Sequence, residues 1–144
     1  MAAQGVTVNW YPEALKAKLA AHVQQNLDMA AITLADAVVG SFGSSEVSGE
    51  TSGATKAQRG ANRSTAWGPP NVDTGHLKRN VGYEKPAGNP LVRRVGTGVG
   101  NKESVGYAMW LEFGTRKMLP RPFLRPMLHK MRGQIRVILS RPMK

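Results

Sequence analysis

The sequence has no cysteine, few aromatic residues and no long apolar run. Without cysteine, the chain has neither a disulfide framework nor a thiolate nucleophile. No stretch approaches the roughly 18 apolar residues that a membrane span requires, and no positively charged start leads into an apolar segment. We therefore expect a soluble, unprocessed protein that is compatible with a reducing cytoplasm. Its 144 residues predict one domain, 1–144, that is long enough to bury a single core.

Acidic residues are also scarce, and their distribution is uneven. Twenty Lys and Arg face nine Asp and Glu, which gives a net charge of +11 and a pI of about 10.6. Glu112 is the last acid, and nine Lys and Arg follow it. A field of this sign favours polyanions or acidic protein partners.

Residues 12–40 predict one long helix after an N-terminal arm, 1–11. Pro12 and Glu13 are typical of a helix start, and Gly40 of a helix end. Apolar residues recur between them at steps of three and four. These residues are Leu15, Leu19, Val23, Leu27, Ala30, Ala31, Leu34 and Val38.

Residues 40–70 are rich in Gly and Ser and offer little to bury, so we predict a long flexible insert. A loop of this length is either a mobile insertion or a segment that orders against a neighbouring subunit. The following segment predicts a turn at Asp73-Thr74-Gly75 and then short strands at 77–84, 91–97 and 105–108. The expected fold is α+β, with the long helix and a C-terminal helix packed on an antiparallel sheet of three to four strands.

Residues 107–127 hold two of the three Phe, and we predict a buried bend there. Gly114 should end a short element, and Pro120 and Pro122 should keep the connector extended. The expected core of the bend is Trp110, Leu111, Phe113 and Phe123.

The last segment predicts an amphipathic helix that Pro122 or Pro126 opens and Pro142 ends. Its expected buried stripe is Leu124, Leu128, Met131, Ile135 and Ile138. Beside it lies a basic ridge, which we define as Arg121, Arg125, His129, Arg132 and Arg136. The ridge is a solvated face, a contact for acidic residues of a partner, or a non-specific DNA-phosphate contact. It carries no motif for sequence-specific recognition.

Catalysis is not favoured by the remaining motifs. An aspartic-protease site needs two copies of Asp-Thr-Gly sharing a proton, and the chain has one, with polar neighbours, so a structural turn is expected. Gly96 to Gly100 lacks the Lys-Ser/Thr ending of a phosphate loop. The three histidines lack ligand spacing, so neither a metal nor a cofactor is expected. Glu112 is expected to form an ion pair with Arg116 or Arg121.

Two separated motifs resemble the tail-completion, or head–tail joining, proteins of the neck of long-tailed bacteriophages. The first is Asp73-Thr74-Gly75 with Leu77. The second runs from Tyr107-Ala108 through Glu112, Phe113, Gly114 and Thr115 to Pro122 and Phe123. The resemblance implies a non-enzymatic virion protein that forms a ring, commonly a hexamer, at the head–tail junction. Its implied partners are head-closure, tail-terminator and tail-tube proteins, with DNA passing through the lumen.

Under that resemblance, the candidate partner or lumen surface is Arg121, Arg125, Arg132 and Arg136. Two alternatives stay open: the tail-terminator role, and a basic accessory protein that binds nucleic acid without sequence specificity. The protein is expected in the host cytoplasm during assembly and then in the virion.

Overall fold

The structure is a computed structural model that describes residues 12–42, 68–70, 72, 74–100 and 102–143. Its elements, in chain order, are α1 (Pro12–Ser41), α3 (His76–Arg79), β1 (Val81–Glu84), β2 (Arg94–Thr97), α4 (Ala108–Phe113) and α5 (Leu124–Leu139). The α+β class is confirmed. The predictions for the N-terminal arm, for most of the insert and for Asp73 lie outside the described residues.

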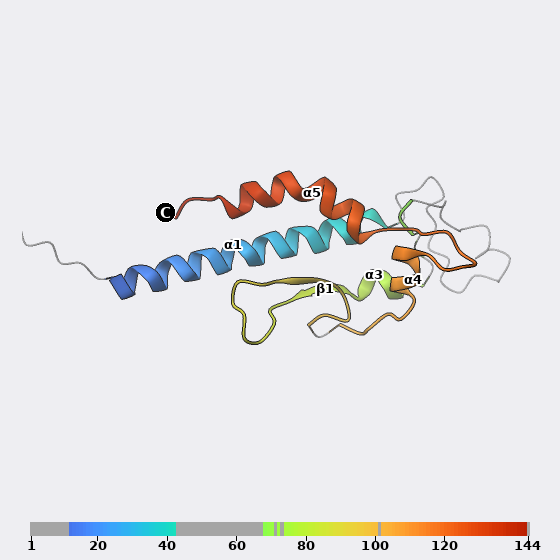
Figure 1. Ribbon diagram of the computed structural model, residues 1–144, viewed down its shortest axis with the longest axis horizontal. Coiled ribbons are helices and arrows are strands. Elements are labelled where there is room, and N and C mark those ends of the chain that lie inside the picture. Colours follow the sequence, from blue (N-terminus) through green and yellow to red (C-terminus); the bar gives the residue numbers. More distant parts are fainter. Residues whose placement is uncertain (1–11, 43–67, 71, 73, 101, 144) are drawn as a thin grey trace, which may run out of the picture.

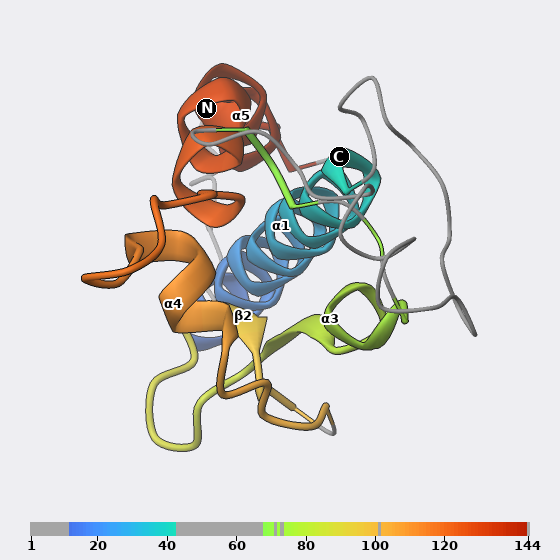
Figure 2. The same cartoon turned by 90° about the vertical axis from the view of Figure 1, so that its right-hand side faces the viewer.

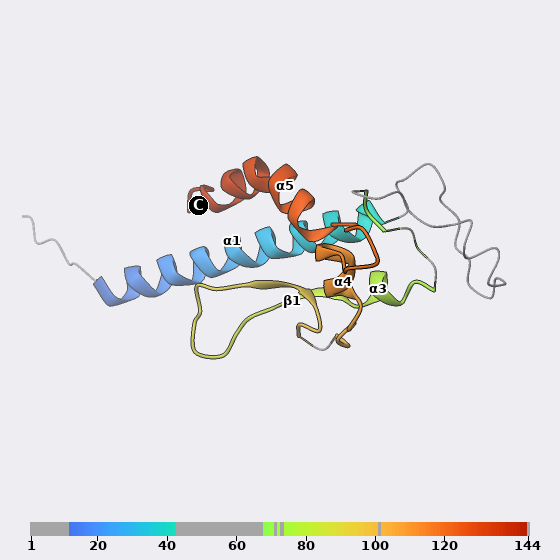
Figure 3. The same ribbon diagram turned by 45° about the vertical axis from the view of Figure 1, so that its right-hand side comes forward.

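The long helix α1 lies in the middle of the molecule, between α5 and the β1–β2 hairpin (Figures 1 and 3). Our expectation that both long helices pack on the sheet is therefore wrong: α5 packs on α1. The reason lies in the small residues of α1. Ala30 and Ala31 point about 100° apart on the helix, and both are buried. With small side chains on two sides, α1 can pack closely against α5 and against the hairpin.

Only two strands form in the described part of the chain, which corrects the expected three to four. They pair antiparallel, with Val81 opposite Thr97 and Glu84 opposite Arg94. Residues 77–79, expected as strand, belong to α3, because Gly75 turns left-handed and its carbonyl accepts the N–H of Arg79. Residues 91–93 lie outside the sheet, and Ala108 starts α4 instead of ending a strand.

The core sits where the C-terminal end of α1 meets α3, the hairpin, α4 and the start of α5. Its buried members are Val38, Phe42, Leu77, Val81, Val105, Ala108 and Phe123. The rings of Phe42 and Phe123 are 5.3 Å apart and tilted by 52°, which is a favoured aromatic geometry. Helix α1 thus ends one residue after the predicted Gly40, and Phe42, which we had assigned to the insert, belongs to the core.

The N-terminal third of α1 projects beyond both neighbours (Figure 1). Every residue from 12 to 21 is exposed, so the predicted apolar stripe is helical but not buried at this end. Leu15 and Leu19 are exposed because α5 and its C-terminal extension end before covering them, and Val23, at the edge of that cover, is 37% exposed. The carbonyl of Arg141 accepts a hydrogen bond from Asn26 and lies 2.9 Å from the His22 ring, near the limit of that cover.

Candidate interaction surfaces

Helix α4 ends at Gly114, as predicted. Gly114 has φ 76°, and its N–H donates to the carbonyl of Trp110 over 2.8 Å. A Cβ at this position would lie 2.9 Å from the Met118 carbonyl oxygen and from the Pro120 nitrogen. Glycine is needed here both for the backbone angle and for the close approach of the next turn. That turn brings the chain from α4 to the start of α5 (Figure 2).

Glu112 points inward from α4 and is buried. Its carboxylate accepts the backbone N–H groups of Phe123, Leu124 and Arg125 over 2.8, 3.0 and 3.0 Å. These are free donors at the N-terminus of α5, where a negative charge is also favoured by the helix dipole. The expected ion pair with Arg116 or Arg121 is therefore wrong, and Glu112 caps a helix instead.

The helix was predicted to begin at Pro122 or at Pro126. Helix α5 begins between them, at Leu124. Pro126 occupies the third helical position, where an N–H would have no intrahelical partner. It therefore costs the helix no backbone hydrogen bond. The connector before it is fixed by the N–H of Arg121, which donates to the Leu111 carbonyl over 2.6 Å.

The outward side of α4 is apolar and exposed. Met109, Trp110 and Phe113 are 62, 54 and 59% exposed, and we call these three residues the α4 face. A six-residue helix has one inward side, and Ala108, Leu111 and Glu112 occupy it at the spacing i, i+3, i+4. Trp110 and Phe113 were expected in the core, and that prediction is wrong. Leu111 does pack against the core, and Phe123 is fully buried.

The α4 face adjoins the basic ridge. The Arg125 guanidinium lies 4.3 Å from the centroid of the Phe113 ring, which is a cation–π contact. Arg116 and Lys117, exposed in the turn after α4, add two cations. Leu119, in the same connector, is 61% exposed.

The ridge itself is exposed at Arg125, His129, Arg132 and Arg136. All four ion pairs in the described part of the chain involve residues before 95, so none engages the ridge. Arg121 is half-buried, and its Nε has no hydrogen-bond partner among the described atoms. Of the predicted buried stripe, Ile138 is buried, Leu124, Met131 and Ile135 are half-buried, and Leu128 is exposed.

The two sequence motifs meet in the core. Leu77 of the first motif and Ala108 and Phe123 of the second belong to one buried cluster. Gly75 has φ 72°, and the Thr74 hydroxyl accepts the His76 N–H over 3.4 Å, which is the predicted turn chemistry. Among the other motif positions, Tyr107 is exposed, Thr115 pairs with Met118 in an isolated bridge, and Pro122 is half-buried.

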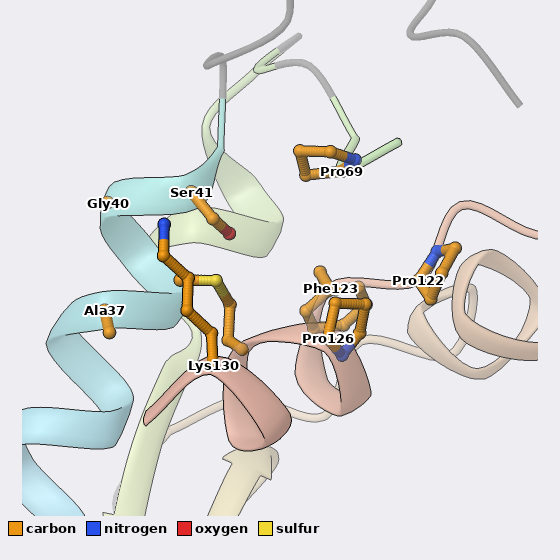
Figure 4. A pocket seen from close by; sticks show the side chains of 9 residues that line it. Ala37, Gly40, Ser41, Pro69, Pro122, Phe123, Pro126 and Lys130 are labelled. Carbon is orange, nitrogen blue, oxygen red and sulfur yellow. The ribbon is translucent and has the colours of Figure 1, made fainter. Parts of the chain in front are cut away.

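A pocket of about 380 Å³ lies between the last turn of α1, Pro69 and the start of α5 (Figure 4). Its lining residues are Ala37, Gly40, Ser41, Pro69, Pro122, Phe123, Pro126, Met127 and Lys130. Lys130 is the single ionisable side chain in this lining. The pocket therefore lacks a pair of groups for acid–base chemistry within the lining that the structure describes.

The hairpin is tied to α1 by Asp28. Its carboxylate pairs with Lys85 over 2.6 Å and with the buried side chain of Arg93. Burial raises the pKa of the Asp28 carboxyl, but the hydrogen bonds from Arg93 and Lys85 outweigh that effect. The pKa lies below its ordinary value.

In the part of the chain that the structure describes, no three His, Asp or Glu side chains gather as metal ligands. Within the same residues, no helix has the length and apolar character to cross a membrane. Comparisons with protein-family models, with curated proteins and with solved structures gave no match. A function must therefore be argued from this chain's own surfaces and motifs.

Proposed function

We propose that the chain is a structural virion protein of the phage neck, a tail-completion or head–tail joining subunit. In this role it forms a ring that connects the head-closure complex to the tail and lets DNA pass. The observation that supports the proposal most is the meeting of the two motifs: Leu77, Ala108 and Phe123 share one core, and Glu112 links α4 to α5. Residues far apart in the sequence thus serve one structural unit.

The uncovered apolar surfaces support an assembly role. A helical stretch without tertiary cover is marginally stable in water, and no described part of the chain covers the first third of α1. Monomers rarely expose large apolar patches. We assign the stripe of Leu15, Leu19 and Val23 to the contact between copies, where closed symmetry fixes the number of subunits. By resemblance, we propose six copies, to match the tail.

The assembly role is tested by sedimentation velocity on the variant Leu15→Ser with Leu19→Ser. We expect the wild-type protein to sediment as a closed oligomer and the variant as a monomer. The variant should keep its folded core, because both leucines are exposed and lie outside the core cluster. Leu91→Ser is the matched control, since Leu91 is equally exposed but lies in the hairpin loop. A monomeric wild-type protein, or a variant with the wild-type mass, would contradict the assignment.

The ridge favours a second candidate, a basic accessory protein that binds nucleic acid without sequence specificity. Among the described residues, no carboxylate forms an ion pair with the cations of the ridge. A surface that binds phosphate groups needs such unpaired cations. Tight binding of the isolated protein to duplex DNA, with an affinity that falls steeply with salt, would favour this candidate. Weak binding would leave the neck role, or the related tail-terminator role, as the better explanation.

A further inference from the structure

The α4 face is an exposed apolar surface on a helix whose backbone is held in place. On the inward side of α4, Ala108 is buried in the core, and Glu112 is bound to three N–H groups of α5. Gly114 fixes where the helix ends. The outward side chains Met109, Trp110 and Phe113 therefore extend from a backbone that is already in place. Presenting anchors from a rigid frame lowers the entropic cost of binding.

The surroundings of the α4 face are positively charged. Arg125 lies on the Phe113 ring, and Arg116 and Lys117 are exposed in the next turn. The nearest acid in the sequence, Glu112, is buried and occupied by its hydrogen bonds. No acid follows it. An occupant of this face therefore gains from bringing carboxylates.

A second copy of this chain is poorly suited to be that occupant. If the α4 face met the same face of a second copy, Arg116, Lys117 and Arg125 would meet the same three cations. Three of the six described acids are already in ion pairs, and Glu112 is bound to the start of α5, so of these acids a second copy would bring only Asp36 and Glu103. Duplex DNA would satisfy the cations but would offer no apolar cover for the Trp110 ring. Trp, Phe, Met and Arg together are the residue types that protein–protein interfaces enrich.

We propose that the α4 face binds an acidic segment of a different protein. The segment's apolar anchor covers Trp110 and Phe113, and its carboxylates meet Arg116, Lys117 and Arg125. The inference deepens the proposed function and rests on it for the partner being another virion component. The face then joins unlike subunits, while the α1 stripe joins like ones.

The test uses the full chain with Trp10→Phe and Trp67→Phe, which leaves Trp110 as the single tryptophan. The probe is a synthetic amphipathic helical peptide of about 16 residues with Leu and Phe on one side and Glu elsewhere. Its matched control has Gln at every Glu position. We expect the acidic peptide to shift Trp110 emission to shorter wavelength and to bind at least about tenfold tighter than the Gln peptide.

Variants locate the binding. Phe113→Ser and Arg116→Glu with Lys117→Glu should each weaken binding of the acidic peptide about tenfold, whereas Leu91→Ser should leave it unchanged. The double charge variant keeps the α4 residues and thus guards against a folding defect. Equal affinity for the acidic and Gln peptides, or no effect of the variants, overturns the proposal.

Two further outcomes name other occupants. If a single-stranded dT oligonucleotide shifts Trp110 emission as strongly as the acidic peptide, the face stacks bases instead. If Phe113→Ser converts an oligomer to monomers, the face joins copies of this chain. Either result overturns the proposal. The proposed function fails separately: a wild-type protein that is monomeric yet binds the acidic peptide refutes the ring and keeps the α4 face.

Discussion

Glu112 stabilises the start of a helix that begins twelve residues further along the chain. Replacing it with Ala leaves three backbone N–H groups without their acceptor. We expect Glu112→Ala to lower the free energy of unfolding by about 2–3 kcal/mol. Urea unfolding followed by circular dichroism measures this value.

The control for that measurement is Glu103→Ala, because Glu103 is exposed and surface substitutions change stability by about 0.5 kcal/mol or less. Glu112→Gln keeps one acceptor oxygen and should fall between the two. Equal stability of Glu112→Ala and Glu103→Ala would show that the carboxylate does not hold α5.

Gly114 is the second residue on which the bend depends. Gly114→Ala places a Cβ against the Met118 carbonyl at a positive φ, and we expect a loss of about 2–3 kcal/mol in unfolding free energy. Gly133→Ala is the contrasting variant. A Cβ at Gly133, inside α5, meets nothing within 4 Å, so this variant should gain about 0.5–1 kcal/mol. Thermal unfolding that ranks the two the other way would contradict the account of the bend.

Asp28 gives the hairpin anchor a pH dependence. Its pKa is lower in the folded than in the unfolded chain, so the folded state binds fewer protons. The stabilisation is complete above the ordinary Asp pKa of 3.8 and is lost as pH falls through the lowered folded-state value. Asp28→Asn should therefore cost stability at neutral pH and flatten the pH dependence below about pH 4. If the free energy of unfolding changes with pH in the same way for both proteins across this range, Asp28 does not anchor the hairpin as described.

At the scale of elements, the two surfaces that the sequence misassigned share one cause. Periodicity identifies a helix and its apolar side, but burial depends on how far the covering elements reach. Ten residues of α1, from 12 to 21, precede the contact that the C-terminal extension makes at His22. In α4, three inward positions were already taken, so Trp110 and Phe113 face solvent despite their size.

Turn chemistry was more predictable from the sequence than strand pairing. Gly114 and Gly75 were identified from local backbone needs, and both adopt the expected positive φ. The sequence did not show that residues 77–79 would form a helical turn instead of a strand. That turn depends on hydrogen bonds from Arg79 and Asn80. The role of Glu112 depends on a contact between distant residues, which spacing alone does not reveal.

Charge-reversal variants test whether the basic ridge on α5 takes part in particle assembly. We expect Arg125→Glu with Arg132→Glu to abolish particle assembly while the purified protein stays folded, because both side chains are exposed. Arg132→Glu alone is compared with Lys78→Glu, which makes the same charge change outside α5. Infectious particles counted by plaque assay give the readout. If the double variant assembles normally, the ridge is a solvated face.

At the scale of the whole molecule, α1 carries α5 on one side and the hairpin on another, and its first third extends beyond both (Figures 1 and 3). This arrangement separates the α1 stripe from the α4 face along the longest axis. A subunit with two separated surfaces can contact like neighbours through one and an unlike partner through the other. The charge of +11 then favours an acidic protein as the unlike partner.

The central claim, that this chain is a subunit of the phage neck, is tested most directly by locating it in particles. Tailed particles whose copies carry a tag after Lys144 are labelled with gold-conjugated antibody and imaged by electron microscopy. The account predicts label at the head–tail junction. Label on the capsid or at the tail tip, or tailed particles that contain none of this chain, would contradict it.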